Sequence, residues 1–270
     1  MASTATTIPD RSVSVGRILS RAFATMGSNP GTVFGISFAF GALPGLILNY
    51  GASMLGYSQQ NLTAGVITPL FFFSVLAVTA LLGIAFSMLT QGALVRATVA
   101  HSEGRDASFG EAAAAGLRVI LPLFVLGILF GLGIMLGLFL LIVPGIILCT
   151  MWAVAAPALV EERTGVFGAF GRSRYLTKGA RWQVFAIGLM MIALYWAFSA
   201  LIAALVFGIY GMGELQAITA QGLPIAWLAV SGLITTVLTA IITTMQTSLY
   251  VELREWKDGP ATAVLTEVFA

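Results

Sequence analysis

The charged residues that could do chemistry gather in one segment after the middle of the chain. Two adjacent acids, Glu161 and Glu162, are followed by Arg163 and then by four further cations, Arg172, Arg174, Lys178 and Arg181. Arginine forks bind phosphate bidentately, so this set predicts a lipid-headgroup or phosphodiester-binding site. If the segment is one continuous helix, Arg174, Lys178 and Arg181 lie along one side of it.

A second interpretation of these residues stays open. Cations also set membrane topology, pair with nearby acids or lie in an anionic headgroup layer. Glu161 is then expected to pair with Arg172 or Arg174, which joins the acids to the following helix. Under the first interpretation the partners are membrane lipids, above all anionic phospholipid. Nothing in the sequence points to nucleic acid or names a protein partner.

The sequence contains no recognisable reaction chemistry. It has no GxxxxGK[ST] phosphate loop, HExxH zinc pair or GxSxG elbow. His101 is the only histidine and Cys149 the only cysteine, so neither a disulfide framework nor a CxxC motif exists. No ionisable residue lies deep in a predicted span, which counts against proton-coupled and ion-coupled transport. We therefore expect a non-enzymatic protein without catalytic residues, cofactor or metal.

The composition predicts an all-α integral membrane protein. Hydrophobic residues make up 59% of the chain and charged residues 9%, against about a quarter charged in soluble domains. A bilayer core takes about 20 apolar residues per helix. One membrane domain is expected at 12–258, between a disordered tail at 1–11 and a C-terminal tail at 259–270. Its six expected spans are 31–55, 64–91, 120–141, 146–160, 182–210 and 223–250.

Two segments beside the spans have the pattern of amphipathic helices. Within 12–28, apolar residues from Ile18 to Met26 share one face, which predicts an interfacial helix. A helix packed on the cytosolic end of the bundle is the alternative. Ser108 and Glu111 have capping-box spacing, which predicts a short helix that begins there.

Proline and glycine mark the expected bends and close contacts. Pro44 lies within the first span, where a local adjustment can satisfy the freed carbonyl. The pairs Gly127–Gly131 and Gly133–Gly137 lie on different faces of the third span, which predicts two neighbours and a place inside the bundle. A tight reversal is expected at Pro144 and Gly145.

The sixth span carries an unusual run of hydroxyls. Two interpretations are open: each hydroxyl bonds the carbonyl one turn back, or a polar stripe lines a cavity. The polar residues are Thr235, Thr236, Thr239, Thr243, Thr244 and Gln246.

The distribution of Lys and Arg predicts the topology. The loops 56–63, 142–145 and 211–222 contain no cation, whereas the tail, the other connectors and the C-terminal segment hold all thirteen. By the positive-inside rule both termini are expected in the cytoplasm. The segments 12–91, 107–161 and 164–250 each read as an amphipathic segment and a hairpin, which predicts a pseudo-threefold repeat.

The stretch 140–185 resembles a bacterial family of multi-span proteins. It is similar to the membrane domain attached to some glycerophosphoryl diester phosphodiesterases and to related uncharacterised inner-membrane proteins of enterobacteria. Weaker matches begin at VGRILSRAF and SLYVELREWKDG. The matching elements are Pro144, Gly145, Trp152, Pro157, Glu161, Glu162, Arg172, Ser173, Leu176, Gly179 and Trp182.

This resemblance implies a six-span bundle in the bacterial inner membrane and a connection to phospholipid turnover. It supplies no catalytic residue, because in the fused proteins the activity belongs to a separate soluble domain. Two functions follow: a non-enzymatic protein linked to phospholipid or envelope homeostasis, or a transporter or flippase-like carrier of a small or lipid-derived solute. A polar cavity reaching the middle of the bundle favours the carrier, whereas a dry bundle favours the first function.

Overall fold

The computed structural model describes residues 13–221 and 225–259, and every regular element within these ranges is helical. Six helical stretches there are long and apolar enough to cross a membrane. The chain is therefore an all-α, multi-pass membrane protein, as predicted. Its elements are α1 (Val15–Ser28), α2 (Pro30–Ile36), the π-helical η1 (Ser37–Ala42), α3 (Leu43–Met54), α4 (Gln59–Thr63), α5 (Pro69–Ser102), α6 (Phe109–Leu140), α7 (Ile142–Met151), α8 (Ala155–Glu162), α9 (Gly165–Thr177), α10 (Arg181–Gln221) and α11 (Ile225–Asp258).

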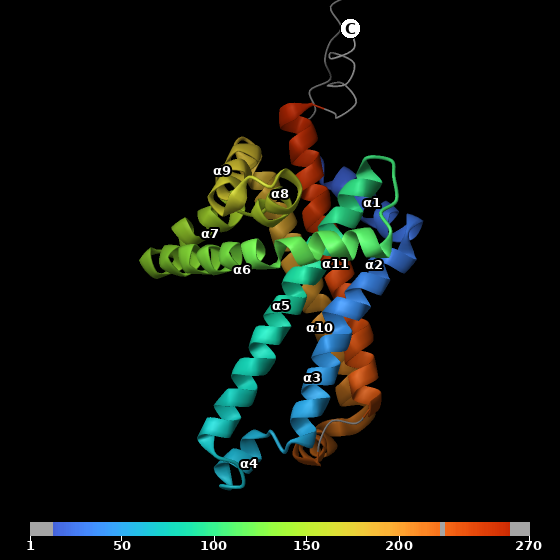
Figure 1. Cartoon of the computed structure of the whole chain (residues 1–270), viewed down its shortest axis with the longest axis vertical. Helices are drawn as coiled ribbons and strands as arrows, with labels where there is room; N and C mark the ends of the chain where they lie inside the picture. Colours follow the sequence, from blue (N-terminus) through green and yellow to red (C-terminus); the bar gives the residue numbers. More distant parts are fainter. Residues whose placement is uncertain (1–12, 222–224, 260–270) are drawn as a thin grey trace, which may run out of the picture.

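The long helices lie in two directions. Figure 1 shows α3, α5, α10 and α11 along the long axis of the molecule, while α6 and α7 form a hairpin that crosses it. Helices α1, α8 and α9 lie at the end where α11 finishes, and α4 lies at the opposite end. The expected tails at 1–11 and 260–270 lie outside the described residues.

The first span contains a π-helical turn beside its proline. It runs from Pro30 to Met54, close to the expected range. Pro44 lacks an N–H, and in an α-helix its ring would crowd the carbonyl of Phe40. The η1 turn lies directly before Leu43 and Pro44 and changes this spacing. It is the local adjustment that a proline within a span requires.

The second and third spans differ from their expected bounds. Helix α5 begins at Pro69 rather than at 64, because Thr68 caps it by accepting the N–H of Phe71 at 3.2 Å. Ser108 likewise accepts the N–H of Glu111 at 3.2 Å. The expected short helix at Ser108 is therefore correct in its start but wrong in its end, since it continues unbroken as the span α6. The alanines after Glu111 are strong helix formers and do not interrupt it.

The reversal between α6 and α7 is not at Pro144 and Gly145. It occurs at Leu141, whose φ of −167° and ψ of 152° are extended, and both predicted residues lie in the first turns of α7. Proline suits a first helical turn because its missing N–H needs no partner there. Gly145 has another role: a Cβ there would lie 2.5 Å from the Leu138 side chain and 3.0 Å from the Leu138 nitrogen.

Helix α6 contacts two neighbours, α5 and α7, as predicted, but only the pair Gly133–Gly137 makes close contacts. A Cβ on Gly133 would lie 2.3 Å from the Trp152 ring, and one on Gly137 would lie 2.9 Å from the Cα of Gly145. A Cβ at Gly131 would meet nothing within 4 Å. The prediction that α6 lies inside the bundle is wrong, because much of its apolar surface is exposed. Glycine permits a close approach on one face and does not by itself imply burial on another.

The fourth span is broken. Helix α7 ends at Met151, a turn covers 152–154, and α8 begins with Ala155, so that Pro157 lies in the first turn of α8. Helix α9 binds the backbone groups that the break leaves without helical partners. The Ser173 hydroxyl donates to the Met151 carbonyl at 2.8 Å and accepts from the Val154 N–H at 3.3 Å. Trp152 packs on Phe170 of α9, with ring centroids 4.7 Å apart.

The amphipathic helix α1 packs on the last turns of α11. Its residues Ile18 and Ala22 are fully buried, and its Arg17 lies 2.6 Å from Glu252 of α11. This contact is the one expected of a helix on the end of the bundle, and an interfacial position stays a prediction. The threefold repeat also stays a prediction. A break separates α9 from α10 as it separates α1 from α2, but α6 has no such break.

Candidate functional site

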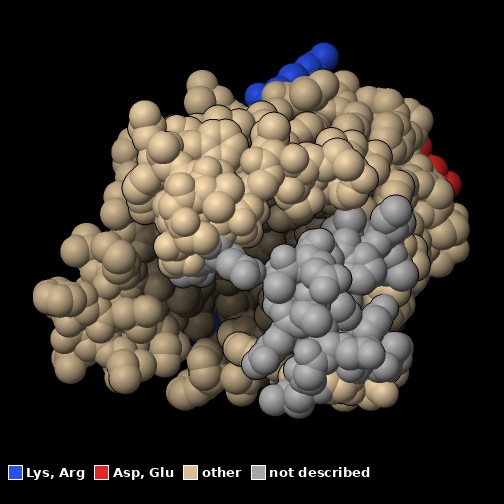
Figure 2. Space-filling view, turned by 90° about the horizontal axis from the view of Figure 1, so that it is seen from below, with Lys and Arg blue, Asp and Glu red and all other residues tan. Residues whose placement is uncertain are grey.

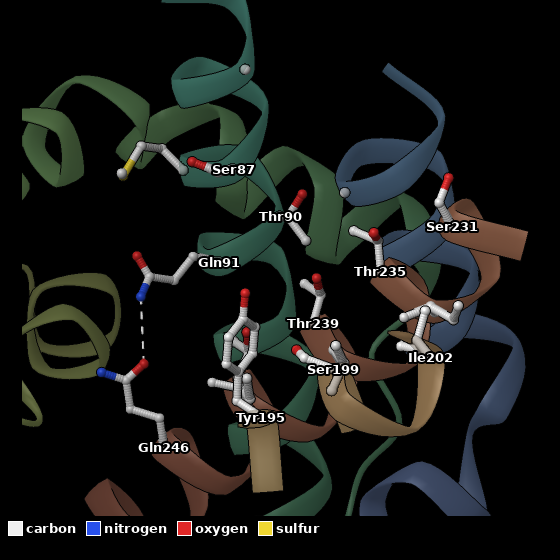
Figure 3. Close-up of a pocket in the computed structure, with 17 residues that line it drawn as sticks. Ser87, Thr90, Gln91, Tyr195, Ser199, Ile202, Ser231, Thr235, Thr239 and Gln246 are labelled. Carbon is white, nitrogen blue, oxygen red and sulfur yellow. Dashed lines mark hydrogen bonds between the residues drawn. The ribbon is translucent and has the colours of Figure 1, made fainter. Parts of the chain in front are cut away.

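A partly open cavity with polar groups in a largely apolar lining lies between the middle parts of four spans. Its volume is about 730 Å³. We call it the threonine cavity, and Figure 3 shows its lining from η1, α5, α10 and α11. Among the lining residues that the structure describes, none is charged. The polar ones are Ser87, Thr90, Gln91, Tyr195, Ser199, Ser231, Thr235, Thr239, Thr243 and Gln246.

The threonines of α11 divide into two groups. Thr236 and Thr244 are buried and donate to the carbonyls of Gly232 and Ala240, at 2.8 and 2.6 Å. Thr235, Thr239 and Thr243 line the cavity, and their hydroxyls make no hydrogen bond to a described residue. Residues four apart lie on one helical face, so these three hydroxyls form a stripe. Both interpretations of the sequence therefore hold, each for a different face of α11.

Two amides close the cavity toward the charged end of the molecule. Gln91 of α5 donates to the Gln246 side chain at 3.5 Å, and Gln246 donates to the Ala153 carbonyl at 2.9 Å (Figure 3). Ala153 belongs to the break between α7 and α8. The broken span thus supplies a non-helical backbone carbonyl that binds Gln246 at the end of the cavity; transporters with discontinuous helices also use backbone groups at such breaks.

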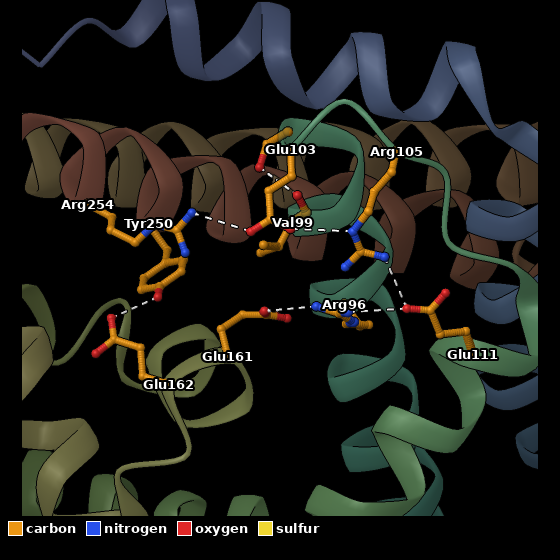
Figure 4. A network of polar contacts seen from close by, with 10 residues as sticks. Arg96, Val99, Glu103, Arg105, Glu111, Glu161, Glu162, Tyr250 and Arg254 are labelled. Carbon is orange, nitrogen blue, oxygen red and sulfur yellow. Dashed lines mark hydrogen bonds and ion pairs between the residues drawn. The ribbon is translucent and has the colours of Figure 1, made fainter. Parts of the chain in front are cut away.

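Beyond the amides lies a layer of ion pairs. Arg96 of α5 reaches Glu161 of α8 at 3.3 Å and Glu111 of α6 at 3.2 Å (Figure 4). One turn past Gln246, the Tyr250 hydroxyl donates to Glu162 at 2.9 Å. This layer joins the ends of α5, α6, α8 and α11. Its charged groups lie past the cavity and do not line it.

The predicted pairing of Glu161 with Arg172 or Arg174 is wrong. Glu161 pairs with Arg96, and it is Glu162 that accepts from Arg172 at 2.8 Å. Adjacent residues of a helix point about 100° apart, so the two acids face different neighbours.

Arg172 is engaged by two acids. It also binds Asp258 at the end of α11. Burial lowers the pKa of Arg172, but hydrogen bonds to Asp258 and Glu162 and the charges of both acids raise it further, so the net pKa lies above its ordinary value. The guanidinium predicted to bind a lipid phosphate is therefore occupied within the protein.

The other predicted cations are exposed but do not share one helical side. Helix α9 ends at Thr177, Lys178 is extended, and Gly179 has a φ of +95°, before α10 starts at Arg181. Glycine is required at 179, because a Cβ there would also lie 3.1 Å from the Trp256 ring. Arg174, Lys178 and Arg181 form no ion pair with a described residue, and the Trp182 side chain beside them is 82% exposed.

Sequence reasoning missed the cavity residues on α5 and α10. Tyr195 and Ser199 are four residues apart and so share a face of α10, which is a signal that could have been found. Gln91 and Gln246 are amides within apolar helices, and such polar groups in spans often mark function. The sequence does not show that these two amides, which are 155 positions apart, lie within hydrogen-bonding distance of each other.

Comparisons with protein-family models, with curated proteins and with solved structures find no match to this chain. The resemblance to the phosphodiesterase-associated membrane domain therefore stays a prediction. In the described part of the chain, no three His, Cys, Asp or Glu residues lie together as metal ligands would. The described lining of the threonine cavity offers hydroxyls and amides as hydrogen-bond donors and acceptors.

Proposed function

We propose that the protein is a carrier that binds a small or lipid-derived, uncharged solute in the threonine cavity. The observation that supports this most is the stripe of Thr235, Thr239 and Thr243, which lines a cavity of about 730 Å³ between the middle parts of the spans. In hydrocarbon an unused hydroxyl is costly, so a solute or water is the expected partner. The described part of the lining carries hydroxyls and amides but no charge, which favours a neutral solute.

The location of the protein is part of the same proposal. We place it in the bacterial inner membrane with both termini in the cytoplasm, as the positive-inside rule implies. Charged layers then lie on the cytoplasmic side, and the face at which α4 lies is outside. Seen from that face, the described surface is almost free of charged side chains and is hollowed near its centre (Figure 2).

Tracer flux from proteoliposomes tests the carrier. We expect reconstituted protein to release an uncharged polyol or amide faster than empty liposomes do, and to leave sodium and phosphate inside. Thr239→Trp fills the cavity and should abolish the added flux. Leu233→Trp is the matched control, because Leu233 is on the same helix, is 64% exposed and does not line the cavity. The proposal is contradicted if no tracer leaves the protein-containing liposomes faster than empty ones. It is also contradicted if Thr239→Trp leaves the flux unchanged.

A second function is supported by the charged end. Arg174, Lys178 and Arg181 are exposed beside Trp182, and Phe167 of the same region is 81% exposed. Cations and an aromatic anchor suit an anionic headgroup layer. This supports a non-enzymatic role linked to phospholipid or envelope homeostasis, with anionic phospholipid as the partner.

Measuring the lipid that co-purifies with the protein distinguishes a lipid-binding role of these cations from a role in membrane topology alone. Each cation near an anionic surface contributes on the order of 1 kcal/mol, so changing all three to Gln should reduce retained anionic lipid by up to about a hundredfold if the contributions add. Arg172→Gln is the control, because that side chain is held by Glu162 and Asp258 and should leave lipid retention unchanged. Mass spectrometry that finds the same anionic lipid in the triple variant excludes the lipid role.

A further inference from the structure

A second cavity lies within the charged end of the molecule, apart from the threonine cavity. Its volume is about 330 Å³, and it is bounded by the ends of α5, α6 and α8. We call it the arginine cavity. Its charged lining consists of Arg96, Glu111, Arg118, Glu161 and Arg163.

The two acids of this cavity are incompletely paired. Glu161 gives one oxygen to Arg96, while its other oxygen is buried and has no hydrogen-bond partner in the described part of the protein. The Glu161 side chain is only 10% exposed. Glu111 uses the same single oxygen for Arg96 and Arg105. Its second oxygen accepts nothing from a described residue, and its side chain is 43% exposed. The cavity therefore keeps acceptors for a positively charged or hydrogen-bonding group.

The two outer arginines are free to bind an anion. Arg118 and Arg163 are exposed, and neither forms an ion pair with a described residue. Each guanidinium presents a planar set of donors that matches phosphate oxygens. Unpaired arginine donors and unpaired carboxylate oxygens thus line one small cavity, and a ligand that uses both must combine an anionic group with a hydrogen-bond donor, for which an ammonium is the strongest match.

The backbone of Arg163 supports a functional role. Its φ of 50° and ψ of 30° are left-handed, and in the described ranges it is the one non-glycine residue with a positive φ. It follows the last turn of α8, where glycine is the usual residue because it adopts this conformation without strain. An arginine in this left-handed conformation is locally unfavourable, and such strained residues concentrate at functional sites.

We propose that the arginine cavity binds a zwitterionic phosphate ester of the phosphoethanolamine type. The phosphate lies between Arg118 and Arg163, and the ammonium lies at Glu111 and near the unpartnered oxygen of Glu161. A purely anionic ligand would meet two carboxylates whose second oxygens Arg96 and Arg105 leave unpaired, whereas an ammonium can hydrogen-bond to them. The same chemistry is offered by a phosphatidylethanolamine headgroup and by the free phosphate ester. This site is independent of the carrier activity.

Binding to the full-length protein in a neutral detergent tests the site, with calorimetry or native mass spectrometry as the readout. The probes are short-chain phosphatidylethanolamine, phosphatidylcholine and phosphatidylglycerol, soluble phosphoethanolamine, and inorganic phosphate. We expect about tenfold tighter binding of the phosphoethanolamine probes than of phosphatidylglycerol or inorganic phosphate. Phosphatidylcholine should also bind more weakly, because its trimethylammonium has no N–H to donate. Preference for the lipid over soluble phosphoethanolamine assigns a lipid headgroup, and equal affinity assigns the free ester; both support the site.

The Arg163→Gly variant separates a loss of binding from a loss of folding. Glycine relieves the left-handed strain, so thermal stability should stay equal or rise while phosphoethanolamine affinity falls about tenfold. Glu111→Gln should weaken the phosphoethanolamine probes more than inorganic phosphate. Lys257→Gln, a change at a cation that lines neither cavity and lies outside the Arg174, Lys178 and Arg181 group, is the control and should leave phosphoethanolamine affinity unchanged. Equal binding of phosphatidylglycerol and phosphatidylethanolamine, or an unchanged affinity in Arg163→Gly, overturns the proposal.

Discussion

The α6–α7 hairpin and the α5–α11 side of the molecule are both apolar, yet they pack in opposite ways. In the hairpin, Gly137 and Gly145 bring two backbones into contact, and a Cβ on Gly137 would lie 2.9 Å from the Gly145 Cα. Around α11, hydroxyl-bearing residues such as Thr239 line an open cavity instead. The difference shows that apolar composition alone does not decide whether membrane helices close on one another. Glycine on a shared face lets two backbones approach closely, whereas the face of α11 with Thr235, Thr239 and Thr243 borders open space.

The largest effect is expected where the hairpin is tightest. Gly145→Val places its side chain against the Leu138 side chain and backbone, which should destabilise the protein by at least about 2 kcal/mol and reduce its accumulation. Gly131→Val makes the same change on α6 where nothing lies within 4 Å, and it should stay within about 0.5 kcal/mol. Unfolding in mixed detergent micelles measures both. Equal stability of the two variants would show that the close contact is not formed.

The next prediction compares the two faces of α11. Thr244 is fully buried, so Thr244→Leu should overpack its site and cost about 1–3 kcal/mol. Thr239→Leu extends into the cavity and should cost less than about 1 kcal/mol. The same unfolding measurement distinguishes them. A larger loss at Thr239 than at Thr244 would mean that the cavity is filled by protein in the membrane.

A smaller effect is expected at the amides that close the cavity. Gln246→Leu removes the donor to the Ala153 carbonyl and should cost about 1 kcal/mol. Gln91→Leu removes only the 3.5 Å contact with Gln246 and should cost less. Both variants should still fold, and the order of their unfolding free energies is the readout. The reverse order would show that the link between α5 and α11 matters more than the contact with the broken span.

These elements also show what the sequence predicts and what it does not. The six spans and the cap at Ser108 follow from local patterns of hydropathy and hydrogen-bonding residues, and both are present. The expected turn at Pro144 is not present, because proline suits both a reversal and the first turn of a helix, and here it lies in the first turn of α7. Leu141, where the chain reverses, carries no turn signal in its side chain.

The sequence predicts a lipid-headgroup site at Arg172, Arg174, Lys178 and Arg181, and it indicates only one wall of the threonine cavity. A threonine stripe on the sixth span was among the interpretations, but the sequence could not show that Tyr195 and Ser199 of α10 face it. Nor could spacing alone choose between Glu161 and Glu162 as the partner of Arg172, because that choice depends on where α9 lies relative to α8. Long-range placement of helices decides both points.

Reaction of single cysteines with a small, charged methanethiosulfonate reagent tests the central claim, that the threonine cavity holds water and can admit a polar solute. The background is Cys149→Ala, which removes the single native thiol. A thiol reacts as its thiolate, which needs water around it. The account predicts that Thr239→Cys, in the cavity, reacts about tenfold or more faster than Thr244→Cys, on the buried face of the same helix. Equal rates, or protection of both cysteines, would contradict it.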